Sequence, residues 1–200
     1  MKNSLIYFAL FNLPIILYGQ LSFSPEVGLN NYNFVEKDPG RQSLNIDDKL
    51  QERYFGLCVE QQLSSRLFVG VNTYYSFIKH DVELNAPNSF PILGFEYNLI
   101  DVVPTISFLV HHSIKLGIGS VVQNQVRKRF ILINGEEEKL SARRGFGYSI
   151  SIEGVYKKIS LSLSYKQLTS LPDEPFFQYS KFTGIRAGIR YRLIELFGEN

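Results

Sequence analysis

Apolar and polar residues alternate one by one along most of the chain after residue 20, and this period of two constrains the fold more than any other feature. In the segment from Ile159 to Tyr165, every second residue is apolar and serines fill the positions between them. Successive side chains of a β-strand point to opposite faces, so the pattern predicts strands with one apolar face. No window of the sequence has a helical period. We therefore predict an all-β protein.

Size and charge narrow the class of protein further. The chain has 200 residues, enough for one domain of ordinary size. A mean hydropathy of -0.05 excludes a bundle of membrane helices. The 21 basic and 19 acidic residues leave a net charge of +2, too small for a dedicated nucleic-acid-binding protein, so no nucleic-acid partner is expected. The single cysteine, Cys58, excludes a disulfide framework and a cysteine-ligated zinc site, and no cofactor or metal is expected.

The first twenty residues have the pattern of a secretory signal peptide. Lys2 supplies a positive start, and the segment from Leu5 to Leu17 is mostly apolar. This run is shorter than the ~20 residues that a membrane-spanning helix needs. Gly19 offers a small residue at a plausible cleavage point. We predict a signal peptide over residues 1–20 and a barrel domain over residues 21–200.

The polar face of the predicted strands has the composition of a crowded interior. It is rich in Gly and Ser, with isolated charges between them, whereas a free surface would carry more Lys, Glu and Thr. The apolar face carries aliphatic residues in mid-strand and Tyr or Phe near the ends, as a lipid-facing band with aromatic girdles does. A strand of about 10 residues tilted by ~40° spans roughly 25 Å, the height of such a band. We therefore predict a barrel whose apolar side faces outward.

Eight strands account for the alternating segments. Their predicted ranges are 21–33, 53–62, 66–78, 101–110, 114–127, 144–156, 159–169 and 183–194. Tight turns and long connections alternate between them, as in an antiparallel up-and-down transmembrane β-barrel of the outer membrane, with turns in the periplasm and loops outside the cell. The even number of strands places both termini in the periplasm. Asn134-Gly135 predicts a hairpin that lengthens the fifth and sixth strands. Residues 92–98 would form an additional strand in a ten-stranded alternative.

In this pattern the chain resembles the small OmpA-like or OmpX-like outer-membrane β-barrels of Gram-negative bacteria. The Tyr18-Gly19-Gln20 end of the signal and the repeated turns look like members from Bacteroidota-type bacteria, the PorT-like outer-membrane β-barrel proteins. The resemblance implies outer-membrane lipid and lipopolysaccharide as surroundings and the barrel-assembly machinery as a partner during biogenesis. Tyr191 or Phe197 would supply the closing aromatic of the terminal strand, which is the usual assembly signal of such barrels.

Eight strands enclose a space that side chains can fill. The alternation points charges of both signs into this lumen, and we expect ion pairs among Glu26, Glu60, Glu153, Lys115, Lys166, Arg186, Arg190 and Arg192. The first and last strands are neighbours in a closed barrel, so Glu26 is expected beside Arg186 or Arg190. Such pairs would plug the barrel, with Cys58 as a small filler on the same face. A proton relay or a narrow channel is the alternative function of these charges.

Catalysis has only weak candidates, all of them around the three histidines. His111-His112-Ser113 falls in a predicted periplasmic turn, where we expect solvated side chains. His80-Asp81, after Ser76, falls at the opposite rim, where lipid A acyl-modifying barrel enzymes act. A nucleophile needs a base that a third group orients, and sequence spacing does not show this arrangement. We therefore predict no catalytic residues.

Basic residues flank the third long connection. Arg127, Lys128, Arg129, Arg143 and Arg144 would lie at the outer-leaflet rim, where charge-assisted hydrogen bonds to lipopolysaccharide phosphates are expected. Ion pairs with the acidic residues 136–138 of the same connection are the alternative role of these bases.

Taken together, these features predict a non-enzymatic integral outer-membrane β-barrel with a filled lumen. Its role would be envelope-structural, or adhesion or binding through the loops, to a partner that the sequence does not specify. One alternative is a lipid A acyl-modifying enzyme. The other is a secreted lipocalin-like carrier of an apolar ligand, which would require the apolar faces to point inward.

Overall fold

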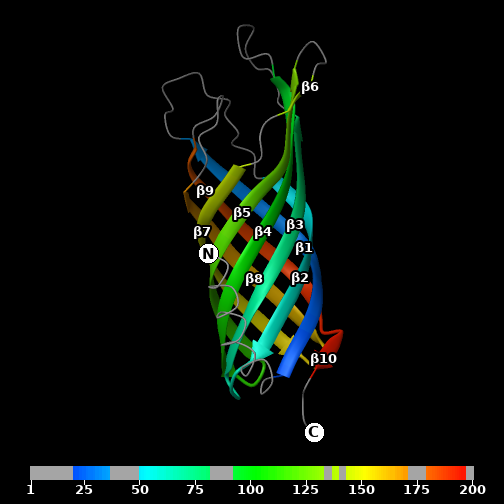
Figure 1. Cartoon of the computed structure of the whole chain (residues 1–200), viewed down its shortest axis with the longest axis vertical. Coiled ribbons are helices and arrows are strands. Elements are labelled where there is room, and N and C mark those ends of the chain that lie inside the picture. The colour runs from blue at the N-terminus through cyan, green and yellow to red at the C-terminus, as the bar shows by residue number, and fades with distance from the viewer. Residues whose placement is uncertain are drawn as a thin grey trace, which may run out of the picture.

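The barrel predicted from the sequence is present in the structure (Figure 1). The computed structural model describes residues 20–36, 50–81, 92–132, 137–139, 143–170 and 179–196. The barrel wall consists of the long strands β1 (Gln20–Glu36), β2 (Leu50–Gln62), β3 (Leu67–Asp81), β4 (Ile92–His111), β5 (Ile114–Leu132), β7 (Arg143–Tyr156), β8 (Ile159–Ser170) and β9 (Tyr179–Tyr191). Each strand pairs antiparallel with the next, and β1 pairs with β9, which closes the sheet on itself. The eight-stranded all-β fold is confirmed.

Two short strands extend this barrel at opposite ends (Figure 1). β6 (Glu137–Lys139) pairs with the far part of β5, so β5 and β6 form a hairpin that continues beyond the wall. β10 (Ile194–Leu196) pairs with the first residues of β1. Neither strand widens the barrel, and residues 92–98 belong to β4, so the ten-stranded alternative is wrong. The predicted turn residues Asn134-Gly135 and residues 1–19 of the predicted signal peptide lie outside the described residues.

Pro25 marks the break between β9 and β10. β1 pairs with β9 as far as Glu26 opposite Arg190, and with β10 from Phe23 opposite Ile194. One extra residue therefore lies on the β9–β10 side, which is a β-bulge. Proline has no N–H group to donate to the sheet, so regular pairing is interrupted there. A hydrogen bond of 2.9 Å from the Leu193 amide to the Phe23 carbonyl resumes the pairing.

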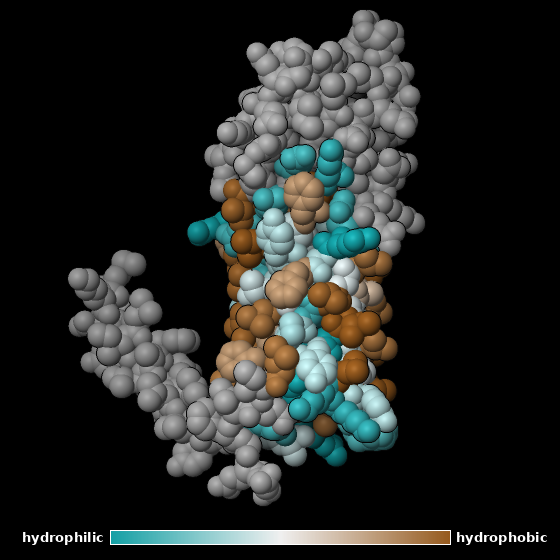
Figure 2. Space-filling model, turned by 90° about the vertical axis from the view of Figure 1, so that its right-hand side faces the viewer, coloured by the Kyte–Doolittle hydropathy of each residue, from teal (hydrophilic) through white to brown (hydrophobic). Residues whose placement is uncertain are grey.

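The apolar faces of the strands point outward. On β8, Leu161 is 62% exposed, whereas Lys166 on the opposite face is 4% exposed. Figure 2 shows apolar residues gathered around the middle of the described surface, with hydrophilic residues at both edges. Such a surface is unfavourable in water and favourable in hydrocarbon, and it rules out the carrier alternative, whose apolar faces would line the interior. The predicted orientation is confirmed. Among the described residues, no helix is long and apolar enough to cross a membrane.

The two ends of the barrel differ in the length of their connections. Residues 63–66, 112–113 and 157–158 join strands by tight turns at one end, which we call the turn end. Residues 37–49, 82–91, 133–142 and 171–178 join them at the other, which we call the loop end. This alternation agrees with the expected pattern of connections.

Candidate functional site

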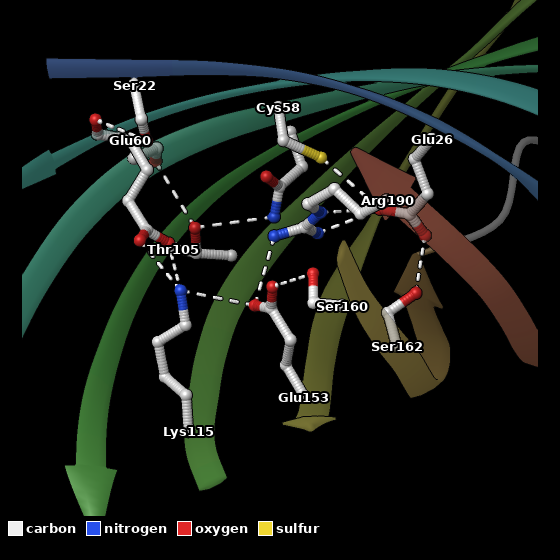
Figure 3. A network of polar contacts seen from close by, with 12 residues as sticks. Ser22, Glu26, Cys58, Glu60, Thr105, Lys115, Glu153, Ser160, Ser162 and Arg190 are labelled. Atoms are coloured by element: carbon white, nitrogen blue, oxygen red, sulfur yellow. Dashed lines mark hydrogen bonds and ion pairs between the residues drawn. The ribbon is translucent and has the colours of Figure 1, made fainter. Parts of the chain in front are cut away.

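The lumen is the part of the molecule where polar chemistry is concentrated. Five charged side chains from five different strands meet in its half nearer the turn end (Figure 3). Arg190 joins two of them, with Nη2 at 2.8 Å from Glu26 Oε2 and Nη1 at 3.1 Å from Glu153 Oε2. Lys115 Nζ lies 3.2 Å from Glu153 Oε2 and 2.7 Å from Glu60 Oε1. We call this alternating chain of acids and bases the turn-end network.

Small polar groups complete the hydrogen bonding of the buried carboxylates in this network. The Tyr54 hydroxyl donates to Glu26 Oε1 at 2.5 Å, and the Ser162 hydroxyl donates to the same oxygen at 2.6 Å. Ser160 donates to Glu153 Oε1 at 2.5 Å. Cys58, which the sequence places as a filler, is buried and donates to Glu26 Oε2 from Sγ at 3.3 Å. Burial of a carboxylate is tolerated when its oxygens are satisfied in this way.

A second network, farther toward the loop end, is centred on Asp101, which the sequence analysis did not single out. Its Oδ2 accepts hydrogen bonds from Lys166 Nζ at 2.5 Å and from Arg186 Nη2 at 2.7 Å. Its Oδ1 accepts a bond from Gln123 Nε2 at 3.0 Å. Arg186 Nε also donates to Asn30 Oδ1 at 2.9 Å. This Asp101 network therefore holds two cations for one carboxylate.

Aromatic rings compensate for the second positive charge. Arg186 Cζ lies 3.7 Å from the ring centroid of Tyr74. Lys166 Nζ lies 4.8 Å from the ring centroid of Tyr32 and 5.2 Å from that of Phe182. Cations over aromatic faces are attracted by the ring quadrupole, and the attraction grows when the pair is desolvated. The rings thus stabilise both cations in the narrow lumen.

Apolar side chains fill the lumen beyond the Asp101 network. Ile78, Leu99, Leu168 and Phe182 are each no more than 3% exposed. Leu168 lies opposite Phe182 in the register of β8 and β9, and the Phe182 ring centroid is 5.2 Å from that of Tyr32. We call these four residues the apolar cap. They close the lumen toward the loop end and were not expected from the sequence.

Little space remains inside the barrel. A cavity of about 20 Å³ adjoins Glu60, Glu153 and Arg190 of the turn-end network, and its lining includes four serines of β7 and β8, Ser149, Ser151, Ser162 and Ser164. This volume accommodates about one water molecule. In the part of the barrel that the structure describes, the lumen is therefore filled by side chains.

The filled lumen predicts that the protein does not conduct solutes. Liposomes that contain the purified protein should remain impermeable to sugars, because the two networks and the apolar cap leave no continuous aqueous path. An osmotic swelling assay measures this directly, with a general porin in the same lipid as the positive control. Free entry of sugar-sized molecules would contradict a filled lumen.

The structure brings some of the predicted lipopolysaccharide-contact residues together in the sheet. Arg143 and Arg144 of β7 lie opposite residues 124 and 125 of β5, a few positions before Arg127 in that strand. Arg144 is exposed, whereas the side chains of Arg127, Lys128, Arg129 and Arg143 lie outside the described residues. Among the predicted lumen residues, Arg192 lies at the turn-end mouth, where it lines a small cavity together with Glu60.

The histidine-containing segments show no catalytic arrangement. The rings of His111 and His112 stack with centroids 3.7 Å apart, and His111 Nδ1 lies 3.4 Å from Ser113 Oγ at the exposed turn. In the described part of the chain, no carboxylate bonds to either ring, so no triad forms there. Ser76 is buried inside the lumen, where it accepts hydrogen bonds from Asn30 and Tyr32, and it is not a nucleophile at the rim. The side chains of His80 and Asp81 lie outside the described residues.

Comparison with known proteins identifies the class of fold. The structure is similar to that of Ail, the attachment invasion locus protein of Yersinia pestis, with a TM-score of 0.53 and 15% identity over 88% of this chain and 99% of Ail. A structure of Ail in complex with the heparin analogue sucrose octasulfate gives a TM-score of 0.52 and 14% identity over 88% of this chain and 99% of that one. Neisserial surface protein A is also similar, with a TM-score of 0.55 and 14% identity over 86% of this chain and 97% of that one. No family model and no curated protein matches the sequence. The fold is therefore that of the small eight-stranded outer-membrane barrels.

Proposed function

We propose that this chain is a non-enzymatic integral protein of the bacterial outer membrane. The observation that carries the proposal is the apolar outer surface around a filled, ion-paired lumen. Since a filled barrel does not conduct solutes, the function of this protein depends on the rigid barrel wall and on the connections at the loop end. In this proposal the turns and both termini face the periplasm, and the loops face outward. The signal peptide over 1–20 directs export, and the assembly machinery inserts the barrel over 21–200.

The role proposed for the barrel is envelope-structural, or adhesion or binding through its loops. The strands of the wall are joined by the longer connections at the loop end and by the shorter ones at the turn end. Binding residues are often found on loops that a rigid scaffold positions. Ail, which has a similar fold, is an attachment invasion protein and binds a heparin analogue, which supports a binding role without specifying a partner here. Tyr18-Gly19-Gln20 supports a place among PorT-like barrels of Bacteroidota-type bacteria.

Cell fractionation with heat-dependent gel mobility tests this proposal. We expect the protein in the outer-membrane fraction, released only by detergent, because its apolar belt requires a hydrocarbon environment. An unheated sample should migrate differently from a boiled one, since a closed barrel unfolds in detergent only on heating. Periplasmic and inner-membrane marker proteins serve as controls. Recovery of the protein in a soluble fraction without detergent would refute the proposal.

Lipopolysaccharide is the proposed lipid partner at the loop end. Replacing Arg127, Arg129, Arg143 and Arg144 by glutamine should reduce the amount of lipopolysaccharide that copurifies, because arginine forms paired hydrogen bonds with phosphate oxygens. Arg66→Gln, at the turn end, is the control and should retain the lipid. Unchanged retention in the fourfold variant would argue against this contact.

The enzyme alternative is tested on lipid A itself. Because Ser76 is enclosed in the lumen, we expect identical lipid A mass spectra from cells with and without the gene. A change in the number of acyl chains would replace the proposed function with lipid A modification.

A further inference from the structure

The three tight turns carry basic residues and no acidic ones. Arg66, His111, His112, Lys157 and Lys158 are all exposed, and the turn segments 63–66, 111–113 and 157–158 contain no acidic residue. The four connections at the loop end have the opposite balance, with four Lys or Arg against nine Asp or Glu. The connecting segments, taken without the strand ends, therefore differ in charge between the two ends of the barrel, with the basic turns at the turn end.

Backbone hydrogen bonds hold the basic turns side by side along the rim. The Leu109 amide donates to the Arg66 carbonyl at 2.8 Å, which ties the first turn to the strand that ends at His111. The Val155 amide donates to the Ser113 carbonyl at 2.7 Å, and the Arg192 amide donates to the Lys158 carbonyl at 2.8 Å. Each turn is thus fixed to the neighbouring strand end. The exposed residues of these turns, Arg66, His111, His112, Lys157 and Lys158, follow one another around the rim, and we call them the basic arc.

The basic arc lies directly at the edge of the apolar belt. Tyr156, immediately before Lys157, is 71% exposed, and Lys157 Nζ lies 5.4 Å from its ring centroid. Ile159, immediately after Lys158, belongs to the exposed apolar face of β8. Tyrosine is enriched where hydrocarbon meets the headgroups, so cations adjacent to Tyr156 emerge at the depth of the lipid phosphates.

We propose that the basic arc binds the phosphate groups of anionic phospholipids in the leaflet at the turn end. This inference rests on the proposed function only in that the barrel must span a membrane. Lysine and arginine near an anionic lipid surface are attracted to it. The arc therefore selects the lipid at one end of the barrel and fixes the depth at which the turns lie.

Bilayers that mix phosphatidylglycerol with phosphatidylcholine test the arc. The turn-end variant is Arg66→Gln/Lys157→Gln/Lys158→Gln. The matched control, Arg53→Gln/Lys79→Gln/Lys181→Gln, removes the same charge from strand positions nearer the loop end. Native mass spectrometry measures which lipid each protein retains. We expect the wild type and the control to retain phosphatidylglycerol preferentially, and the turn-end variant to lose about a hundred-fold of that preference at low salt, from roughly 1 kcal/mol per charge.

Two further measurements distinguish a loss of lipid binding by the basic arc from a failure of the barrel to fold and insert. Heat-dependent mobility in pure phosphatidylcholine reports insertion without any anionic lipid, and a wild type that fails to insert in every bilayer would contradict the proposed function itself. Lys158→Gln alone, which changes a single exposed side chain, should show a smaller loss in the same direction. A wild type without a preference for phosphatidylglycerol would overturn the inference. So would equal preferences in the turn-end variant and the wild type, or equal losses in both triple variants.

Discussion

Replacing Asp101 with alanine is expected to destabilise the barrel by about 3–5 kcal/mol, the cost of leaving a buried ion pair without one partner. Lys166 and Arg186 both bond to the same carboxylate oxygen, and all three side chains are buried. Without Asp101, two desolvated cations would remain in a narrow space with only the aromatic rings and Asn30 to stabilise them. The free energy of unfolding, from urea titration in lipid vesicles followed by gel mobility, measures the loss.

Two further variants test whether the unpaired cations cause this loss of stability. Glu60→Gln should cost much less, because Lys115 keeps Glu153 as a partner and the Glu60 side chain is 14% exposed at the turn-end mouth. Adding Lys166→Met to Asp101→Ala should recover part of the lost stability, since one unpaired charge is then removed. If Asp101→Ala costs no more than Glu60→Gln, the Asp101 network does not stabilise the barrel as described.

The second large effect is expected at a pair of glycines on the seam that closes the barrel. Gly28 and Gly188 lie opposite each other between β1 and β9, and the Tyr54 side chain covers both. A Cβ atom at position 188 would collide with the Tyr54 hydroxyl and lie 2.8 Å from Glu26 Oε1. Gly188→Ala should therefore cost about 1–3 kcal/mol, the range for overpacking a well-filled interior. The same urea titration measures it.

A double-mutant cycle tests whether Tyr54 is the cause of this loss. Tyr54→Phe removes the hydroxyl group that the new Cβ would meet, together with its hydrogen bond to Glu26. In the Tyr54→Phe background, Gly188→Ala should therefore cost less than in the wild type. Additive losses would show that the two positions are not coupled and that the close packing across the seam is not as described.

Most of the fold follows from the period of two. Strands with a clear alternation, such as β8 with its serine and leucine positions, have nearly the predicted ends and the predicted inner and outer faces. The place of Glu26 opposite Arg190 follows from closure, because the first and last strands of a barrel are neighbours. Long-range neighbours are thus predictable where topology alone determines them.

The centre of the lumen was not predictable in the same way. Asp101 lies in the run Leu99-Ile100-Asp101-Val102-Val103, where apolar residues occupy both faces and the alternation disappears. The apolar cap was missed because the alternation assigns a residue to the inner or the outer face only when its phase is known. If the phase is taken one residue off, apolar residues of the inner face are assigned to the outer belt. Pairs of adjacent apolar residues, such as Phe77-Ile78 and Leu99-Ile100, were the available signal.

The aromatic residues of the lumen were also missed. Tyrosine is a residue type expected in the aromatic girdle of a membrane barrel, but Tyr32, Tyr54 and Tyr74 are all buried inside the barrel. Glycines leave room for these rings, because a Cβ atom at Gly56 would lie 2.6 Å from Tyr74 Cδ1. The sequence contains these glycines but does not show which rings lie over them, since that depends on the register between strands.

The outward direction of the apolar side chains is tested most directly by a single tryptophan on the outer wall. The chain contains no tryptophan, so Leu161→Trp introduces one emitter at a position that is 62% exposed on the outer face of β8. Lys158→Trp, in the turn outside the apolar belt, provides the matched reference. In bilayers with brominated acyl chains, we predict strong quenching at position 161 and much weaker quenching at position 158. Equal, weak quenching at both positions would show that Leu161 does not face lipid and would contradict the inside-out barrel.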